Sequence, residues 1–225
     1  MQVLTRDQIA ARAARDIQEG WYVNLGIGLP TLVSSHIPAG REIVFHSENG
    51  ILGLGPRPTP DQMDPDLIDA GKSPATTVKG ASFFSHNDAF VMIRGGHLDL
   101  SLMGGLEVSR RGDLANWTTD DPATPPGVGG AMDLAMGARQ IWILMEHTTK
   151  SGAPRIREKC TLPLTCAGRV SRVYTNMAVM DVREDGLYVR EMVAGVTLQD
   201  LQRVTEAQLR QDSAGAVLDD ASKRC

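Results

Sequence analysis

The amino-terminal segment repeats its apolar positions at helical spacing. Apolar residues recur three or four positions apart between residues 9 and 17, and charged residues occupy most of the other positions. Thr5, followed three residues later by Gln8, fits a capping box at a helix start. Gly20 is a fitting stop. The pattern therefore predicts a helix between Thr5 and Gly20.

Several later segments are almost entirely apolar and short, as buried strands are. They span residues 21–25, 43–46, 89–93, 98–103 and 140–145. Helical patterns lie between some of them, one beginning at Pro30 and another over 131–138. Continuous apolar strands separated by helices are typical of a parallel sheet covered on both faces. We therefore predict a single α/β domain with a mostly parallel central sheet flanked by helices.

The last fifty residues predict a hairpin and a final helix. Residues 177–182 and 187–192 read as strands around the turn 183–186, which ends in Asp-Gly. Thr197 caps an amphipathic helical segment that carries Leu198, Leu201, Val204 and Leu209. The polar stretch 211–225 lacks such a pattern. We expect one domain over residues 1–210 and a mobile tail over 211–225.

Composition narrows the class of protein. The chain has 225 residues, 42% hydrophobic and 22% charged, which suits a globular domain with a proper core. A net charge of -4 and only 4% aromatic residues argue against nucleic acid as a partner. No apolar run approaches the ~20 residues of a membrane span, and the amino terminus lacks a signal-peptide block. We expect a cytoplasmic protein with no membrane partner.

Cysteine and histidine do not indicate a metal site. The three cysteines form no CxxC pair, and the five histidines are dispersed without an HxxxH pair. An odd cysteine count also gives no disulfide framework. We therefore expect no metal.

The stretch 45–56 is the most informative part of the chain. Glu48 follows a short apolar run and precedes Asn49, Gly50, Gly53 and Gly55. Such a pattern suits a carboxylate at a strand tip, beside backbone without bulk, where a large ligand reaches it. The alternative is a plain turn, because Asn-Gly is a strong turn dipeptide. This stretch alone leaves both interpretations open.

Two glycine clusters add candidate chemistry. Gly26 and Gly28 follow a strand and precede a helix, as in a dinucleotide-binding fingerprint, but Thr31 stands where the third glycine belongs. Glu48 lies about where such a fold places its ribose-binding acid. A nucleotide-dependent oxidoreductase therefore stays open, beside a simple tight turn.

The second cluster comprises Gly127, Gly129 and Gly130 ahead of the helical pattern at 131–138. Unpaired backbone N–H groups there could hold a phosphate or a developing oxyanion. A plain loop is the alternative.

Other polar residues have bland interpretations beside functional ones. Arg94 and Asp99 could line a cleft, but a structural ion pair between them is preferred. Glu146-His147 could be an acid/base pair or a capping turn. Residues 56–76 form a long excursion rich in proline and aspartate, of the kind that is often functional. No GxSxG elbow and no P-loop is present.

Taken together, the segments resemble one known family. They read VNLGIGLPT (23–31), HSENGILGLGP (46–56), MIRGGHLDLSLMGGLEVS (92–109), GDLANW (112–117), GVGGAMDLAMGA (127–138) and EHTTKSG (146–152). In order and spacing they resemble the B (beta) chain of class I 3-oxoacid CoA-transferases, from about residue 5 to 205. DIQEGWYVNLGIG, FHSENG and RVSRVYTNMAV look more like the 3-oxoadipate:succinyl-CoA enzymes than the acetoacetate enzymes.

The resemblance implies roles for particular residues. The family's nucleophile is the glutamate of Ser-Glu-Asn-Gly, which matches Glu48 and forms a glutamyl-CoA thioester in ping-pong catalysis. Gly127, Gly129 and Gly130 match the family's oxyanion and acyl-binding loop. A cleft for substrate or coenzyme A is expected to include Asn24, Gly26, Gly28, Asn49 and Gly50. Gly50, Gly53 and Gly55 are expected to leave room for the acyl group.

The resemblance also implies partners. An A (alpha) subunit completes the coenzyme A site, in an A2B2 heterotetramer. Succinyl-CoA and a 3-oxoacid are the substrates, with no tightly bound cofactor and no metal. Acetoacetate in place of 3-oxoadipate, a nucleotide-dependent oxidoreductase and a non-catalytic acyl-CoA sensor remain the alternatives.

Overall fold

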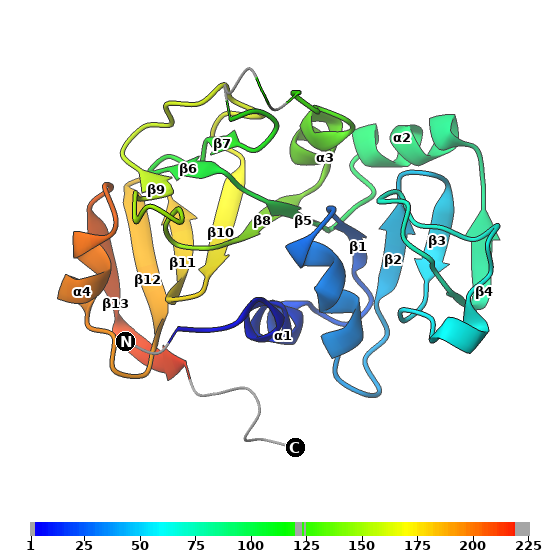
Figure 1. Ribbon diagram of the computed structural model, residues 1–225, viewed down its shortest axis with the longest axis horizontal. Coiled ribbons are helices and arrows are strands. Elements are labelled where there is room, and N and C mark those ends of the chain that lie inside the picture. Colours follow the sequence, from blue (N-terminus) through cyan, green and yellow to red (C-terminus); the bar gives the residue numbers. More distant parts are fainter. Residues whose placement is uncertain (1–2, 120–122, 124, 219–225) are drawn as a thin grey trace.

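A ten-stranded sheet forms the centre of the protein (Figure 1). The computed structural model describes residues 3–119, 123 and 125–218. The strands of this sheet are β1 (Tyr22–Leu25), β2 (Val44–Ser47), β3 (Ile51–Leu54), β4 (Thr77–Phe83), β5 (Leu100–Gly104), β8 (Gln140–Met145), β10 (Val170–Thr175), β11 (Ala178–Arg183), β12 (Gly186–Val193) and β13 (Leu209–Leu218). Their spatial order is β13-β12-β11-β10-β8-β5-β1-β2-β3-β4.

The remaining elements flank this sheet or connect its strands. A small second sheet has the order β7-β6-β9. Its strands are β6 (Glu107–Ser109), β7 (Leu114–Ala115) and β9 (Ile156–Arg157). The α-helices are α1 (Arg6–Asp16), α2 (His86–Arg94), α3 (Ala131–Gly137) and α4 (Leu198–Arg203), and the 3-10 helices are η1 (Leu29–His36) and η2 (Pro60–Gln62).

The middle of the sheet is parallel, as predicted. Strands β10, β8, β5, β1 and β2 pair side by side in one direction. Antiparallel pairs extend the sheet on both sides, through β3 and β4 at one end and β11 and β12 at the other. The protein is a single α/β domain with a mostly parallel central sheet flanked by helices. Carboxyl ends of parallel strands share one edge, so the loops after β1, β2 and β5 meet there.

The core explains why the central strands read as continuous apolar runs. Leu100, Leu102, Ile141 and Ile143 are fully buried in adjacent strands. A strand covered on both faces has no solvent-facing side to mark with polar residues.

The amino-terminal helix is confirmed together with its capping box. The Thr5 hydroxyl accepts from the Gln8 N–H at 3.2 Å, and the Gln8 amide oxygen accepts from the Thr5 N–H at 2.8 Å. The apolar stripe of α1 is buried, including Ile9 and Ala13, and the helix packs against η1.

The strand predicted over 89–93 is wrong, because these residues belong to α2. The helix begins after Ser85, whose hydroxyl accepts from the Asp88 N–H at 3.1 Å. Ala89 and Ile93, four residues apart, are fully buried, whereas Val91 between them is exposed. Five consecutive apolar residues hid this helical period.

The hairpin near the carboxyl terminus is confirmed by the antiparallel pairing of β11 with β12. The helix after Thr197 is confirmed but ends at Arg203, and Leu209 begins β13 instead of closing the helix. The tail expected to be mobile from residue 211 continues in β13 as far as Leu218, parallel to β12. Its backbone adds to an open sheet edge, which requires no apolar pattern. Residues 219–225 lie outside the described part of the chain.

Candidate active site

A cleft of about 370 Å³ lies where the loops after β1, β2 and β5 meet. Its lining comprises residues 24–27, 103–106 and 127–131 with Glu48, Ala70, Asn116 and Leu134. Of the site residues predicted from the sequence, the structure brings together Asn24, Gly26, Glu48, Gly127, Gly129 and Gly130.

Glu48 occupies the turn between β2 and β3. The Gly50 N–H donates to the Ser47 carbonyl at 3.0 Å and closes this turn. The Glu48 side chain is half-buried, and its Oε2 is buried without a hydrogen-bond partner among the described residues. A carboxylate oxygen left in this state is not held by the fold, so it is available to an incoming group.

The environment of Glu48 disfavours its charge. Burial raises the pKa of its carboxyl group above the ordinary value, Asp133 raises it further, and His86 acts in the opposite direction. A poorly solvated carboxylate is a stronger nucleophile once it is ionised, because it has less hydration to lose.

Gly130 lies directly against the Glu48 carboxylate. A Cβ at position 130 would stand 2.5 Å from Glu48 Oε2 and 2.9 Å from Phe90 Cζ. Only a residue without a side chain leaves this carboxylate in place. The glycine at 130 is therefore explained by contact, since its φ of -85° is open to any residue.

The loop 127–130 presents two amides to the cleft. The Gly127 N–H donates to the Trp117 carbonyl at 3.1 Å, which removes it from the set of free donors. The N–H groups of Gly129 and Gly130 donate to nothing in the part of the chain that the structure describes. Gly129 has a φ of +51°, and no atom lies within 4 Å of where its Cβ would be.

Asn24 contributes an acceptor to the same cleft. It is 3% exposed, and its Nδ2 donates to the His46 carbonyl at 3.3 Å. This bond turns Oδ1 away from His46 and leaves it buried without a partner among the described residues. Gly26 serves packing, because a Cβ there would lie 3.0 Å from the Leu102 carbonyl oxygen of β5.

Three residues expected in the cleft do not line it. Gly28, with a φ of +93°, precedes η1, where its conformation favours glycine. Asn49 is exposed and donates to the Ile68 carbonyl at 2.8 Å, which ties the 56–76 excursion to the turn that carries Glu48. Gly50 is buried against Phe84.

The expectation that Gly50, Gly53 and Gly55 leave room for an acyl group is wrong. A Cβ on Gly50 would lie 2.1 Å from the Phe84 carbonyl oxygen, and one on Gly55 would lie 2.5 Å from Thr76 Oγ1. A Cβ on Gly53 would lie 3.1 Å from Ala81. These glycines allow neighbouring segments to approach, so the protein itself fills the space.

The predicted ion pair between Arg94 and Asp99 is also wrong. Arg94 Nε pairs with Asp133 at 2.8 Å, and Asp99 pairs with Arg139 at 2.7 Å. Arg94 closes α2 and points across to α3, whereas Asp99 precedes β5 and binds the residue before β8.

His147 has a structural environment. It is fully buried, and its ring nitrogens contact the hydroxyls of Thr175 at 3.0 Å and Thr205 at 2.8 Å. Burial lowers its pKa to about 4. The ring joins β10 to the segment after α4, away from the cleft.

Sequence reasoning missed part of the cleft wall. Asn116 lines it, donating to the Gly104 carbonyl at 3.2 Å and accepting from Thr165 Oγ1 at 2.6 Å. Residues 103–106 follow β5 directly and include two glycines. Both segments lie in the stretches that carry the family resemblance, which was the available signal.

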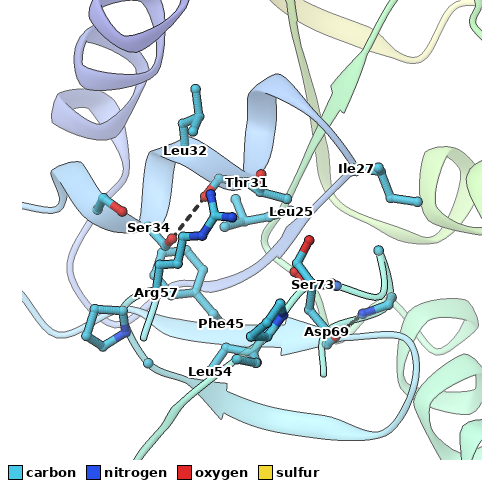
Figure 2. Close-up of a pocket in the computed structure, with 18 of the residues that line it drawn as sticks. Leu25, Ile27, Thr31, Leu32, Ser34, Phe45, Leu54, Arg57, Asp69 and Ser73 are labelled. Atoms are coloured by element: carbon cyan, nitrogen blue, oxygen red, sulfur yellow. Dashed lines mark hydrogen bonds between the residues drawn. The ribbon is translucent and has the colours of Figure 1, made fainter. Parts of the chain in front are cut away.

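A smaller cavity of about 90 Å³ adjoins the cleft (Figure 2). Leu25, Ile27 and Ala70 line both. Arg57 extends along it from the 56–76 side towards η1, where Ser34 donates to the Thr31 carbonyl at 3.0 Å. Arg57 is the cation that lines this cavity, whereas the described lining of the larger cleft contains none.

The described residues offer little for other kinds of site. They contain no cluster of three or more His, Cys, Asp or Glu side chains that could hold a metal ion. Nor do they include a helix with the length and apolar character needed to cross a membrane.

The fold and the cleft agree with one protein class. The family model described as "Coenzyme A transferase" matches residues 6–203, and the chain belongs to that family. Among curated relatives, the chain is 50% identical over 206 residues to the B subunit of 3-oxoadipate CoA-transferase from Acinetobacter baylyi, covering 92% of this chain and 95% of that protein. It is 48% identical to the B subunit of succinyl-CoA:3-ketoacid coenzyme A transferase from Helicobacter pylori, covering 90% and 97%.

A solved structure shows the same fold at low sequence identity. An acyl-CoA transferase from Escherichia coli O157:H7 superposes with a TM-score of 0.75 and 18% identity. The match covers 98% of this chain and 44% of the E. coli chain, so the present chain spans less than half of that protein.

Proposed function

We propose that this chain is the B (beta) chain of a 3-oxoacid CoA-transferase and that Glu48 is its nucleophile. The enzyme moves coenzyme A from succinyl-CoA to a 3-oxoacid, with 3-oxoadipate as the favoured acceptor. The observation that carries the proposal is the buried, unpartnered Oε2 of Glu48 in a 370 Å³ cleft beside the free amides of 129–130. No tightly bound cofactor or metal takes part, since the thioester is itself the substrate.

The first half of the reaction loads the enzyme. The Glu48 carboxylate attacks the thioester carbonyl of succinyl-CoA, forming a mixed anhydride and expelling the coenzyme A thiolate. The thiolate then attacks the glutamyl carbonyl, forming the glutamyl-CoA thioester and releasing succinate. The second half reverses these steps with the 3-oxoacid carboxylate and restores Glu48.

The loop at 127–130 supports this chemistry electrostatically. Each acyl transfer places negative charge on a carbonyl oxygen, and one preorganised N–H donor to such an oxygen is worth ~3 kcal/mol. Gly129 and Gly130 offer such donors, and Gly130 does so in contact with the nucleophile. Gly127 contributes shape only, because its N–H is already used.

The acceptor is proposed from the relatives. Those named for 3-oxoadipate and for 3-ketoacid are 50% and 48% identical to this chain, so identity alone favours 3-oxoadipate only slightly. A second carboxylate on the acceptor needs a cation, which Arg57 in the adjoining cavity or the partner subunit would supply. Acetoacetate is the alternative acceptor.

The proposal includes a partner and a setting. Both relatives are named as one of two kinds of subunit, which supports an A (alpha) partner that completes the coenzyme A site, in an A2B2 heterotetramer. The proposed setting is the cytoplasm, in aromatic catabolism through beta-ketoadipate.

Trapping the loaded enzyme tests the nucleophile. The chain is co-expressed with its A partner, incubated with succinyl-CoA alone and treated with borohydride, and peptides are read by mass spectrometry. Reduction of a thioester to an alcohol is expected at Glu48 and at no other carboxylate. An active preparation in which Glu48 stays unmodified would rule the mechanism out.

Two variants separate the remaining candidates. Glu48→Asp should lose about a hundredfold in rate because the carboxylate is withdrawn from the thioester, whereas a ribose-binding acid would tolerate the change. Turnover that disappears in Glu48→Ala rules out a non-catalytic sensor. Rates with 3-oxoadipate and acetoacetate then decide the acceptor, and faster turnover of acetoacetate would reverse our assignment.

A further inference from the structure

The turn that carries Glu48 is attached to the start of α2 by two hydrogen bonds. The Phe84 N–H donates to the Gly50 carbonyl at 3.0 Å. His86 Nδ1 lies 2.9 Å from the Glu48 carbonyl oxygen. A carbonyl oxygen only accepts, so Nδ1 carries the proton and donates. The main chain of the nucleophile is therefore held by a side chain that can titrate near neutral pH.

The His86 ring is also connected to the Glu48 carboxylate by packing. Its centroid lies 4.7 Å from that of Phe90, one helical turn further along α2. Phe90 Cζ and Glu48 Oε2 both lie within 3 Å of the point where a Cβ on Gly130 would stand. A shift of the His86 ring would thus reach the carboxylate through Phe90 as well as through the turn.

Few charged groups face Glu48, and they come from the two helices packed beside it. Asp133 of α3 opposes its ionisation, and His86 of α2 favours it. Asp133 is itself paired with Arg94 at 2.8 Å. His46, in β2, is buried with a pKa lowered to about 4 by that burial, so it is neutral near pH 7. His86 is exposed to solvent, which leaves it free to exchange protons.

We propose that His86 is a positioning residue for the nucleophile, holding the Glu48 turn through Nδ1–H and, when charged, favouring the ionised carboxylate. This inference rests on the proposed function of Glu48. His86 does not line the cleft, so it acts through Glu48 and not on the substrate. Protonation of His86 in mild acid offsets the tendency of a buried carboxylate to take up a proton, and activity extends to lower pH as a result.

Three variants of the assembled enzyme, with its A partner present, test this role. His86→Asn keeps a donor near the Glu48 carbonyl but carries no charge, and His86→Phe keeps a ring on Phe90 but has no donor. His97→Asn, beyond the end of α2, is the control. The readouts are kcat and KM for succinyl-CoA, the pH profile of glutamyl-CoA formation and the melting temperature.

The donor and the charge have separate signatures. His86→Phe should lower kcat about tenfold or more with KM within about twofold, and His86→Asn should restore most of it at neutral pH. In both variants the acid limb of the pH profile should move to higher pH, while His97→Asn matches the wild type. An acid limb that stays in place in both variants, or full kcat in His86→Phe, overturns the inference.

A purely structural role would lower the melting temperature without moving the acid limb, and it would also overturn the proposal. Failure of the wild-type complex to form any glutamyl thioester would instead refute the proposed function, so the two failures are distinguishable.

Discussion

At the scale of single residues, the candidate site depends on what Gly130 lacks. The carboxylate of Glu48 occupies the space that any side chain at 130 would take, and Phe90 closes that space from the other side. The nucleophile is therefore oriented by contact and not by a hydrogen bond to Oε2. Orientation by contact leaves the oxygen's lone pairs free for reaction.

Gly130→Ala should displace the Glu48 carboxylate and lower kcat by about a hundredfold, because small misplacements of reacting groups have effects of that size. Gly127→Ala is the matched control, since no atom lies within 4 Å of its Cβ position and its φ is not in the left-handed region. Steady-state kinetics of the complex with the A partner measure both. Equal losses in the two variants would contradict the contact argument.

At the scale of elements, the sequence predicted strands best where they are buried on both faces. The central strands β1, β2, β5 and β8 were found within one or two residues, but β3, β4 and β10 were not assigned. The pattern around β3 is interrupted by Gly53, and β4 is an exposed edge strand, so neither has an apolar run. Helix α2 was mistaken for a strand although Ser85 carried a cap signal.

The turn between β2 and β3 makes a stability prediction. Gly50→Ala combines a φ of +106° with a Cβ 2.1 Å from the Phe84 carbonyl oxygen. It should lower the free energy of unfolding by about 3 kcal/mol. Gly20→Ala, at a φ of +77° with open space around it, carries the backbone strain alone and should lose roughly 1 kcal/mol.

Denaturant unfolding of the isolated chain, compared between the two variants, measures this difference. Similar losses would mean that the turn shifts to accept a methyl group. The prediction concerns folding, so it stands independently of the catalytic role of Glu48.

At the scale of the whole molecule, the site was predictable only in part. Asn24, Glu48 and the 127–130 loop carried sequence signals, and the structure brings them to one cleft. Gly28, Asn49 and Gly50 carried equally strong signals and serve turns and packing instead. A glycine pattern shows that space is needed, but the fold decides whether a ligand or another segment fills it. Asn116 entered the cleft through tertiary packing that no local pattern encodes.

Two buried imidazoles make the stability of the whole fold depend on pH. Burial holds the pKa of His46 and His147 at about 4, against 6.5 for the free side chain. Below pH 6.5 the unfolded chain binds protons that the folded chain does not, so stability is complete above that pH and is lost as pH falls towards 4. The melting temperature should decline across this window.

His147→Gln should make that decline shallower, by up to about 1.4 kcal/mol per pH unit in the free energy of unfolding. The variant will be less stable overall because contacts to Thr175 and Thr205 are altered, so the slope and not the absolute value is the test. A slope equal to that of the wild type would show that His147 is not the titrating group.

The contact between Glu48 and Gly130 joins segments that are remote in the chain, one after β2 and the other before α3. Neither half can present the nucleophile properly on its own. A covalent mark on Glu48 would therefore count only molecules in which both halves have come together. Labelling during refolding would follow the completion of the native state, with the chemistry of the enzyme serving as the clock.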